Sequence, residues 1–176
     1  MTSQEEQFLQ AVCKENIDYI TAHVKDITKE ILRSVFVTTP SIAVCEALLK
    51  SGVDVNIWAR IVPYSGPYSA PQECTALYFA CKNEMIAKAQ WLLEHGANVE
   101  EGWRIMPHSI DEYERSTPLK AAVANGNIQL VSLLLQHHAD ANNKTASFDT
   151  ALDVALAQNP INLGIINLLK SVGAKE

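Results

Sequence analysis

The chain has neither a long apolar run nor an excess of positive charge. No stretch of its 176 residues approaches the ~18 consecutive apolar residues of a membrane span, and the charged N-terminal segment is unlike a secretion signal. Fourteen Lys and Arg stand against twenty Asp and Glu, which gives a net charge of -6 and no overall field to attract phosphates. We therefore expect a cytoplasmic protein that binds neither membrane nor nucleic acid.

Cysteine and glycine are also scarce. Cys13, Cys45, Cys74 and Cys81 form no C-x-x-C pair, and a domain of this size does not need disulfides, so we expect reduced thiols. The seven glycines are scattered and do not form a phosphate-binding loop. With 48% hydrophobic residues the chain can bury one core, and we expect a single domain without a cofactor.

What the chain does contain is an internal repeat. Residues 75–80, 117–122 and 150–155 share the pattern T-[AP]-L-x-x-A, and each is followed by a second apolar segment that contains Leu-Leu. The Thr is a good helix N-cap, while Leu and Ala form a small apolar stripe. A Gly after the second segment is typical of a left-handed C-cap. The pattern predicts pairs of antiparallel helices, each of which must stack on the next to bury its stripe.

At these residues the chain resembles the ankyrin repeat family, whose period of about 33 residues separates Thr117 from Thr150. The resemblance implies an all-α fold, namely a solenoid of stacked helix-turn-helix units with hairpin fingers, in one domain spanning 1–176. The approximate repeats are 5–27, 28–60, 75–104, 117–146 and 150–176. The first repeat would be a polar cap.

Several positions depart from the family pattern. Tyr78, Lys120 and Asp153 replace the His that commonly follows T-P-L in the family. Glu15, Glu84 and His138 stand at positions where the family usually has Gly. An insertion at residues 159–160 (Asn-Pro) predicts a helix break in the last repeat.

Two insertions, 57–74 and 101–116, lengthen the fingers. They contain the similar segments RIVPYS (60–65) and RIMPHS (104–109), each preceded by a Trp and in register with the repeats. We expect two elongated fingers that lie side by side and pair as a short sheet.

Aromatic and Arg side chains, which often anchor protein interfaces, are concentrated in these insertions. The predicted partner-binding residues are Trp58, Arg60, Tyr64, Tyr68, Phe79, Trp103, Arg104, His108 and Tyr113. An alternative of equal weight has the two tryptophans packing on each other or on the first helices of the repeats to support the fingers, and Phe79 packing under a finger. The resemblance adds a concave face on the first helices, with Phe79, Lys82, Asn83, Ala121, Ala124 and Asn125.

We therefore predict a non-enzymatic module that binds a protein partner through its concave face and fingers, for example an adaptor or a bacterial effector in the host cytosol. We expect a monomer, with dimerisation through the last repeat as the alternative. A second hypothesis is a divergent enzyme or a metal- or ligand-binding protein, whose site would combine His108, Asp111, Glu112 and Cys74 in the fingers. We predict no metal site at His95, His137 and His138, because neighbouring repeats lie roughly 10 Å apart.

Two asparagines match a further feature of the family. Asn56 and Asn142 stand where oxygen-dependent hydroxylases can modify ankyrin repeats, each two residues after an Asp. The resemblance makes both of them candidates for hydroxylation.

Overall fold

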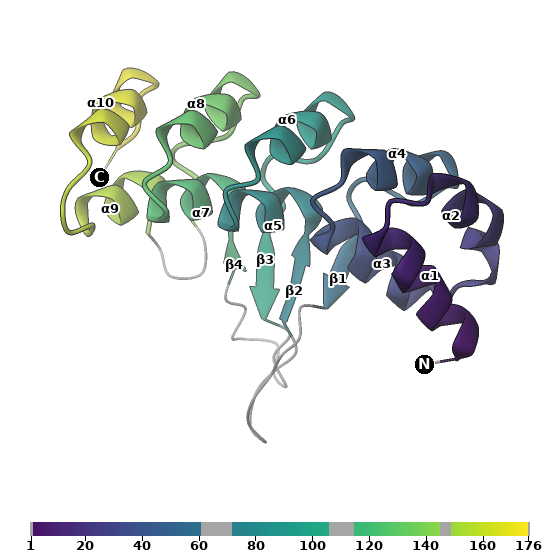
Figure 1. Cartoon of the computed structure of the whole chain (residues 1–176). Coiled ribbons are helices and arrows are strands. Elements are labelled where there is room, and N and C mark those ends of the chain that lie inside the picture. Colours follow the sequence, from purple (N-terminus) through teal and green to yellow (C-terminus); the bar gives the residue numbers. More distant parts are fainter. Residues whose placement is uncertain (1, 61–71, 106–114, 145–148, 176) are drawn as a thin grey trace.

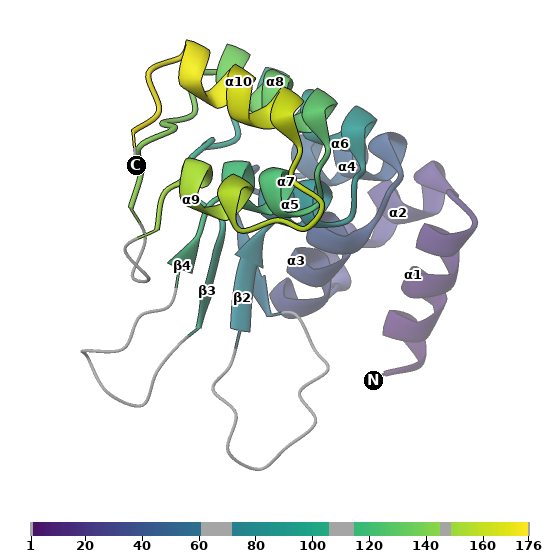
Figure 2. The ribbon, with the colours of Figure 1, turned by 90° about the vertical axis from the view of Figure 1, so that its left-hand side faces the viewer.

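The computed structural model describes residues 2–60, 72–105, 115–144 and 149–175, and within them five helix pairs stack into a curved solenoid (Figure 1). The odd-numbered helices form an inner row from which the fingers project, and the even-numbered helices form an outer row (Figures 1 and 2). The pairs are α1 (Ser3–Cys13) with α2 (Ile17–His23), α3 (Lys29–Thr38) with α4 (Ile42–Lys50), α5 (Ala76–Lys82) with α6 (Ile86–Glu94), α7 (Pro118–Ala124) with α8 (Ile128–Gln136), and α9 (Ala151–Leu156) with α10 (Leu163–Ser171). A short 3-10 helix, η1 (Val24–Asp26), follows α2. The predicted solenoid is confirmed.

The inner helices begin at the threonines of the repeat. The hydroxyl oxygens of Thr75, Thr117 and Thr150 accept hydrogen bonds from backbone N–H groups in the first turn of α5, α7 and α9. Each bond satisfies a donor that has no partner within its own helix. The predicted N-caps are therefore present in all three copies of the motif.

The inner helices approach closely because each carries a small side chain at the same repeat position. Ala80 and Ala122 have no solvent exposure, and Ala155 is 2% exposed. Leu77, Leu119 and Leu152 pack beside them and are equally buried. One continuous core therefore runs through the stack, as expected when each repeat covers its neighbour.

Three turns use residues other than Gly in a left-handed conformation. Glu15, Glu84 and His138 have φ of 52°, 57° and 66°. A side chain with a Cβ adopts this region at a cost of about 1 kcal/mol relative to Gly. The backbone at these three positions therefore keeps the left-handed conformation that Gly usually adopts in the family, although the residue is not Gly.

The fingers join into one antiparallel sheet. Strands β1 (Trp58–Arg60), β2 (Gln72–Thr75), β3 (Trp103–Ile105) and β4 (Arg115–Ser116) lie in that order. The pairing of β2 with β3 links the first finger to the second, which confirms that the two fingers lie side by side. Within the second finger, Gly102 allows β4 to lie close to the start of β3, since an added Cβ would overlap the carbonyl oxygen of Ser116.

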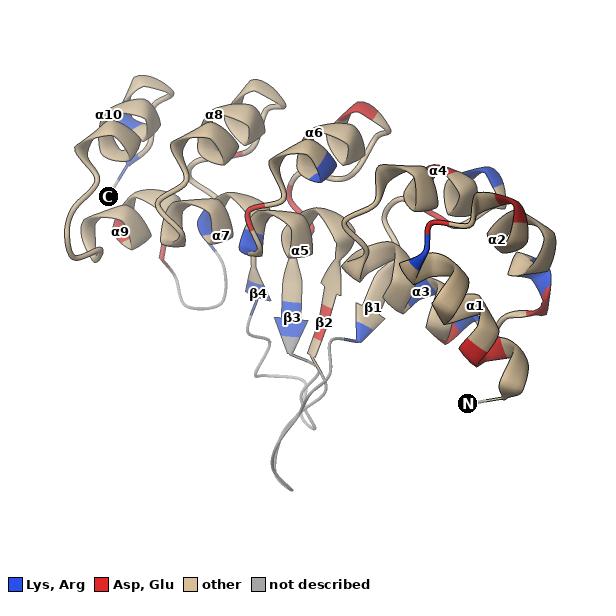
Figure 3. Ribbon diagram, viewed as in Figure 1, with Lys and Arg blue, Asp and Glu red and all other residues tan. Residues whose placement is uncertain are grey.

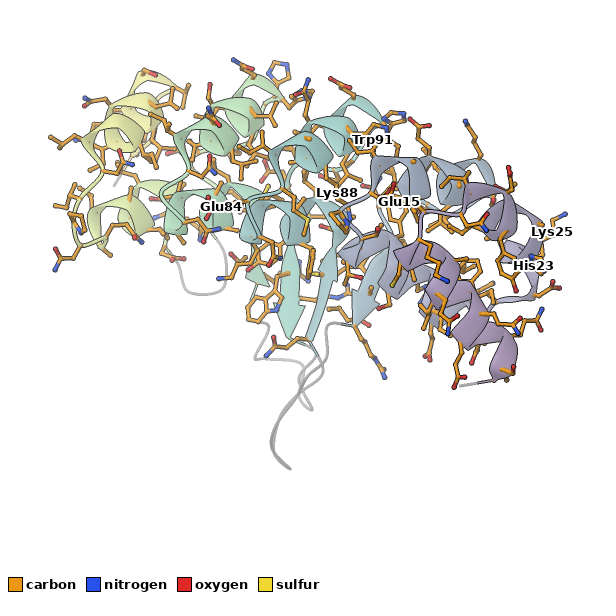
Figure 4. All side chains as sticks on the ribbon, viewed as in Figure 1. Glu15, His23, Lys25, Glu84, Lys88 and Trp91 are labelled. Carbon is orange, nitrogen blue, oxygen red and sulfur yellow. The ribbon has the colours of Figure 1, made fainter. Side chains whose placement is uncertain are left out.

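A buried lysine connects the second and third repeats. Lys88 of α6, labelled in Figure 4, is 1% exposed. Its Nζ donates hydrogen bonds to the carbonyl oxygens of Phe36, Val37 and Thr39 at 2.9, 2.8 and 2.6 Å. These carbonyls end α3 and have no partner within that helix. Burial lowers the pKa of Lys88 to about 8, partly opposed by the nearby thiol of Cys45.

Candidate functional site on the concave face

The concave side of the solenoid is hollowed where the inner helices meet the bases of the fingers. This concave pocket has a volume of about 290 Å³. It is lined by Tyr78, Lys82, Trp103, Arg115, Ser116, Lys120, Ala121, Ala124, Asp149 and Val154. Lys82, Ala121 and Ala124 are among the residues expected on the concave face, and Trp103 is one of the predicted contact residues.

Two aromatic side chains form one wall of the concave pocket. The indole Nε1 of Trp103 donates to Oε1 of Gln72 at 3.3 Å, which ties the ring to the neighbouring strand. Tyr78 is half-buried on α5, and burial raises the pKa of its phenol, while its hydrogen bond with Ser116 acts in the opposite direction. Both rings thus present partly exposed faces from supported positions, as the aromatic anchors of interfaces do.

The floor of the concave pocket is made of small residues. Ala121 and Ala124 come from α7, and Val154 comes from the next inner helix. Because these side chains are short, a side chain from another molecule has room above them. The arrangement is suited to binding a side chain.

Basic side chains surround this floor. The Nζ of Lys120 bonds to Oδ1 of Asp149 at 2.6 Å and to the carbonyl oxygen of the same residue. Lys82, in contrast, is exposed at the end of α5. Arg115 is exposed on β4, where the strand register pairs it with Arg104. The concave pocket therefore combines aromatic, small apolar and cationic groups.

The opposite face of the sheet carries a separate charged network. The strand register places Arg60, Glu73 and Arg104 beside one another, and Nη2 of Arg104 lies 2.7 Å from Oε2 of Glu73. Nε of Arg60 lies 4.0 Å from the other oxygen of Glu73. The guanidinium of Arg104 also stacks 4.1 Å from the centre of a Trp58 ring, a cation–π contact.

The predicted contact residues are thus divided between two faces. Trp58, Arg60 and Arg104 lie in the network described above, while Trp103 lines the concave pocket. The alternative in which the two tryptophans pack on each other is wrong, because the register puts Trp58 opposite Thr75 and Trp103 opposite Cys74, on alternate sides of the sheet. Phe79 is half-buried and packs against the core.

The remaining predicted finger residues, Tyr64, Tyr68, His108 and Tyr113, lie outside the described residues, and so do Asp111 and Glu112 of the second hypothesis. Its last member, Cys74, is buried, and burial raises the pKa of its thiol to about 12. A thiol with that pKa stays protonated near neutral pH and is a poor nucleophile or metal ligand.

His95, at the end of α6, has a structural role. Nδ1 of His95 lies 2.7 Å from the carbonyl oxygen of Trp91, and its ring stacks on the indole at a centroid distance of 4.1 Å. Across the described ranges, no three His, Cys, Asp or Glu side chains are grouped in a way that could hold a metal ion.

Both hydroxylation candidates link neighbouring repeats. Asn56 accepts a hydrogen bond from the backbone N–H of Asn98 at 2.7 Å and donates to the carbonyl oxygen of Gly96 at 3.4 Å. Asn142 makes the corresponding pair of bonds with Lys175 and Gly173 at 2.8 and 3.1 Å. The two asparagines are therefore equivalent in structure as well as in sequence.

Sequence reasoning did not select four of the residues that matter at this site. Tyr78 and Lys120 were noted only as departures from the family pattern, although both occupy the third position after the repeat Thr and line the same pocket. Arg115 and Asp149 join the pocket from segments before α7 and α9, which no periodicity identifies.

Comparisons with known proteins agree with this architecture. The family described as ankyrin repeats in three copies matches residues 39–144. Ankyrin repeat and SOCS box protein 11 of Mus musculus is 30% identical over 113 residues, which cover 64% of this chain and 29% of that protein. Ankyrin repeat and SOCS box protein 2 of Homo sapiens is 27% identical over 128 residues, covering 73% of this chain and 18% of that protein.

A putative ankyrin repeat protein of Fowlpox virus is 35% identical over 102 residues, covering 55% of this chain and 27% of that protein. The chain thus spans less than a third of each of these relatives. Since the family match covers more than half of the chain, and the helix pairs stack as the repeats predict, the chain belongs to the ankyrin repeat family.

Proposed function

We propose that the chain is a non-enzymatic protein-binding module that holds a segment of its partner in the concave pocket. The observation that carries this proposal is the pocket itself, where the supported ring of Trp103 and the short side chains of Ala121 and Ala124 leave room for a side chain of the partner. Solenoid surfaces formed by stacked repeats typically serve binding.

A second hollow of about 680 Å³ crosses the outer helices α6, α8 and α10. None of its lining residues is charged, and it is remote from the fingers. The concave pocket is the better candidate because it combines aromatic and charged groups with the elongated fingers, which distinguish this chain from a plain repeat.

The matched relatives support a binding role in general terms, since they are named for their ankyrin repeats. The identity of the partner, and a role as an adaptor or an effector, remain predictions. In the described ranges no helix is both long enough and apolar enough to cross a bilayer. We keep the expected cytoplasmic location as part of the proposal.

The proposal is tested by filling the concave pocket. Ala124→Arg places a long side chain on its floor from an exposed position, so that the core is undisturbed. Ala157→Arg is the matched control, because Ala157 is exposed at the equivalent position of the next repeat and does not line the pocket. Both variants should melt within about 1 °C of the wild type, since surface substitutions usually change stability little.

Affinity capture from cell lysate, quantified by mass spectrometry, would then compare the three proteins. We expect a protein that is retained by the wild type and by Ala157→Arg and is lost with Ala124→Arg. Equal retention by all three proteins would contradict the concave pocket as the binding site.

The oligomeric state can be tested at the last repeat. Cys81 and Val123 are 0% and 1% exposed, whereas Leu156 at the same repeat position is 39% exposed. We expect a monomer by analytical ultracentrifugation. If a dimer forms, it should involve this end face, and Leu156→Lys should then dissociate it.

A further inference from the structure

The polar atoms of the two aromatic side chains in the concave pocket are already bonded within the chain. Nε1 of Trp103 donates to Oε1 of Gln72 at 3.3 Å, and the hydroxyl of Tyr78 is hydrogen-bonded with Ser116. A polar atom that has its partner inside the protein offers little to an incoming polar group, whereas the half-exposed ring faces are free to pack. The aromatic wall therefore presents apolar surface to a partner.

Most charged groups of the concave pocket also have partners within the chain. Nζ of Lys120 lies 2.6 Å from Oδ1 of Asp149, and the side chain of this lysine is 5% exposed, so the pair belongs to the wall. Arg115 has an interaction of its own within the chain, and it lies opposite Arg104 in the strand register. Lys82 is exposed at the rim, where α5 ends. Figure 3 shows basic positions on α5, β4 and α7, around the bases of the fingers.

The floor of the concave pocket is apolar, and it is open at this junction in particular. Ala121 and Ala124 of α7 stand at the repeat positions that Phe79 and Lys82 occupy on α5. Phe79 packs against the core and fills the corresponding space one repeat earlier. The hollow is therefore a property of the fourth repeat and its neighbours and does not recur along the stack.

This lining limits the side chain that the concave pocket can hold. A cation would meet three basic residues and one acidic residue, so like charges oppose it. A carboxylate would gain one exposed ion pair, which is worth little. A neutral polar group would lose its hydrogen bonds with water and find few replacements. An apolar side chain has none of these costs, and a volume of about 290 Å³ accommodates one or two side chains.

We infer that the partner inserts an apolar side chain into the concave pocket, over Ala121 and Ala124 and beside the rings of Tyr78 and Trp103. This inference rests on the proposed function and specifies the chemistry of the side chain that anchors the partner. The affinity comes from apolar surface removed from water, and the charged groups at the rim contribute little.

The test begins with peptides selected on the wild type from a displayed random library. Their binding is then measured by isothermal titration calorimetry on the wild type and three variants. Ala124→Arg fills the pocket, Ala157→Arg is the matched control outside it, and Lys82→Gln removes the charge at the rim. Circular dichroism and melting temperature establish that all four proteins are folded alike.

We expect the selected peptides to share an apolar residue, whose replacement by Ala weakens binding by about 10- to 100-fold. Binding should be lost with Ala124→Arg and should stay within about twofold of the wild type with Ala157→Arg and Lys82→Gln. Binding should also show a negative heat-capacity change, which is the signature of buried apolar surface, and little dependence on salt.

Selected peptides that share an acidic or a neutral polar residue in place of an apolar one would overturn this inference, and so would a loss of affinity with Lys82→Gln as large as that with Ala124→Arg. The proposed function would survive in both cases if the same peptides fail to bind Ala124→Arg. Peptides with an apolar residue that bind Ala124→Arg as well as the wild type would count against both. If the wild type selects no peptide, the inference is wrong for linear segments, and the capture experiment with Ala124→Arg decides the proposed function separately.

Discussion

Lys88 offers a quantitative test of how the second and third repeats are held together. Lys88→Met preserves the length of the side chain and removes its charge and its three donors. At neutral pH the carbonyl oxygens of Phe36, Val37 and Thr39 would lose these bonds. Each buried carbonyl that loses its donor costs about 1–3 kcal/mol, and Phe36 keeps only the weak donor of the Cys45 thiol at 3.9 Å, so the three together cost about 6 kcal/mol at the middle of that range.

The burial of the charge works in the other direction. The pKa of Lys88 falls from 10.5 to about 8 in the folded chain, chiefly through desolvation. A fall of this size means that burying the ammonium costs about 3 kcal/mol relative to the neutral amine. Lys88→Met recovers that cost, so the net destabilisation at pH 7 should be about 3 kcal/mol.

The shifted pKa of Lys88 also predicts how the stability of the chain changes with pH. Below about pH 8 Lys88 is protonated in both the folded and the unfolded chain, and the cost of burial is constant. Between about pH 8 and 10.5 the unfolded chain binds more protons than the folded chain, so this residue makes stability rise with pH. The wild type should therefore gain nearly 3 kcal/mol relative to Lys88→Met by about pH 10.

The measurement is urea unfolding of the wild type and Lys88→Met at several pH values from neutral to alkaline, with a reducing agent present. The difference between the two proteins cancels titrating groups that do not interact with Lys88, such as the buried thiol of Cys81. Lys82→Met is the control, because it removes an exposed lysine of α5. A difference that stays constant with pH would show that the three carbonyls fully compensate for burial, which would refute the reasoning.

Three further predictions concern the fingers and the repeat junctions. Gly102→Ala should destabilise the chain by about 1–3 kcal/mol in thermal unfolding, since the added Cβ overlaps a backbone oxygen, and an unchanged melting temperature would contradict this close approach. Arg104→Met should cost about 1 kcal/mol, with coupling to Glu73→Gln in a double-mutant cycle, because the partly exposed pair supports the sheet. A loss of partner binding without a loss of stability would instead make Arg104 a contact residue. Tryptic peptides containing Asn56 and Asn142 should gain the mass of one oxygen after incubation with an ankyrin-directed hydroxylase, and unmodified peptides would count against the predicted sites.

Much of the architecture follows from short-range patterns. A Thr before a Leu/Ala stripe specifies where an inner helix begins, because the hydroxyl satisfies a backbone donor only a few residues away. The duplicated segments that begin at Arg60 and Arg104 predict adjacent fingers, because their spacing equals that of the repeats. Such features depend on neighbours in the chain or on a fixed period, and both are visible in the sequence.

The residues of the candidate binding face are harder to predict from the sequence. Trp58 lies two residues before Arg60 and Trp103 one residue before Arg104, and the register places the two tryptophans on opposite faces of the sheet, one under Arg104 and the other on the concave pocket. An offset of one residue in strand pairing reverses the direction of every side chain. Composition alone does not make that distinction, whereas the unequal spacing of the tryptophans from the duplicated segments could have indicated it.

The sequence by itself determined the repeat, the helix boundaries set by the threonines and the pairing of the fingers. Only the tertiary structure decided the partners of Lys88, whose position in the repeat is occupied by the buried apolar residues Leu130 and Ile165 in the next two copies. It also decided that Tyr78, Lys120 and Asp149 meet in one pocket. These contacts join residues tens of positions apart, and they depend on the distance and angle at which the repeats stack.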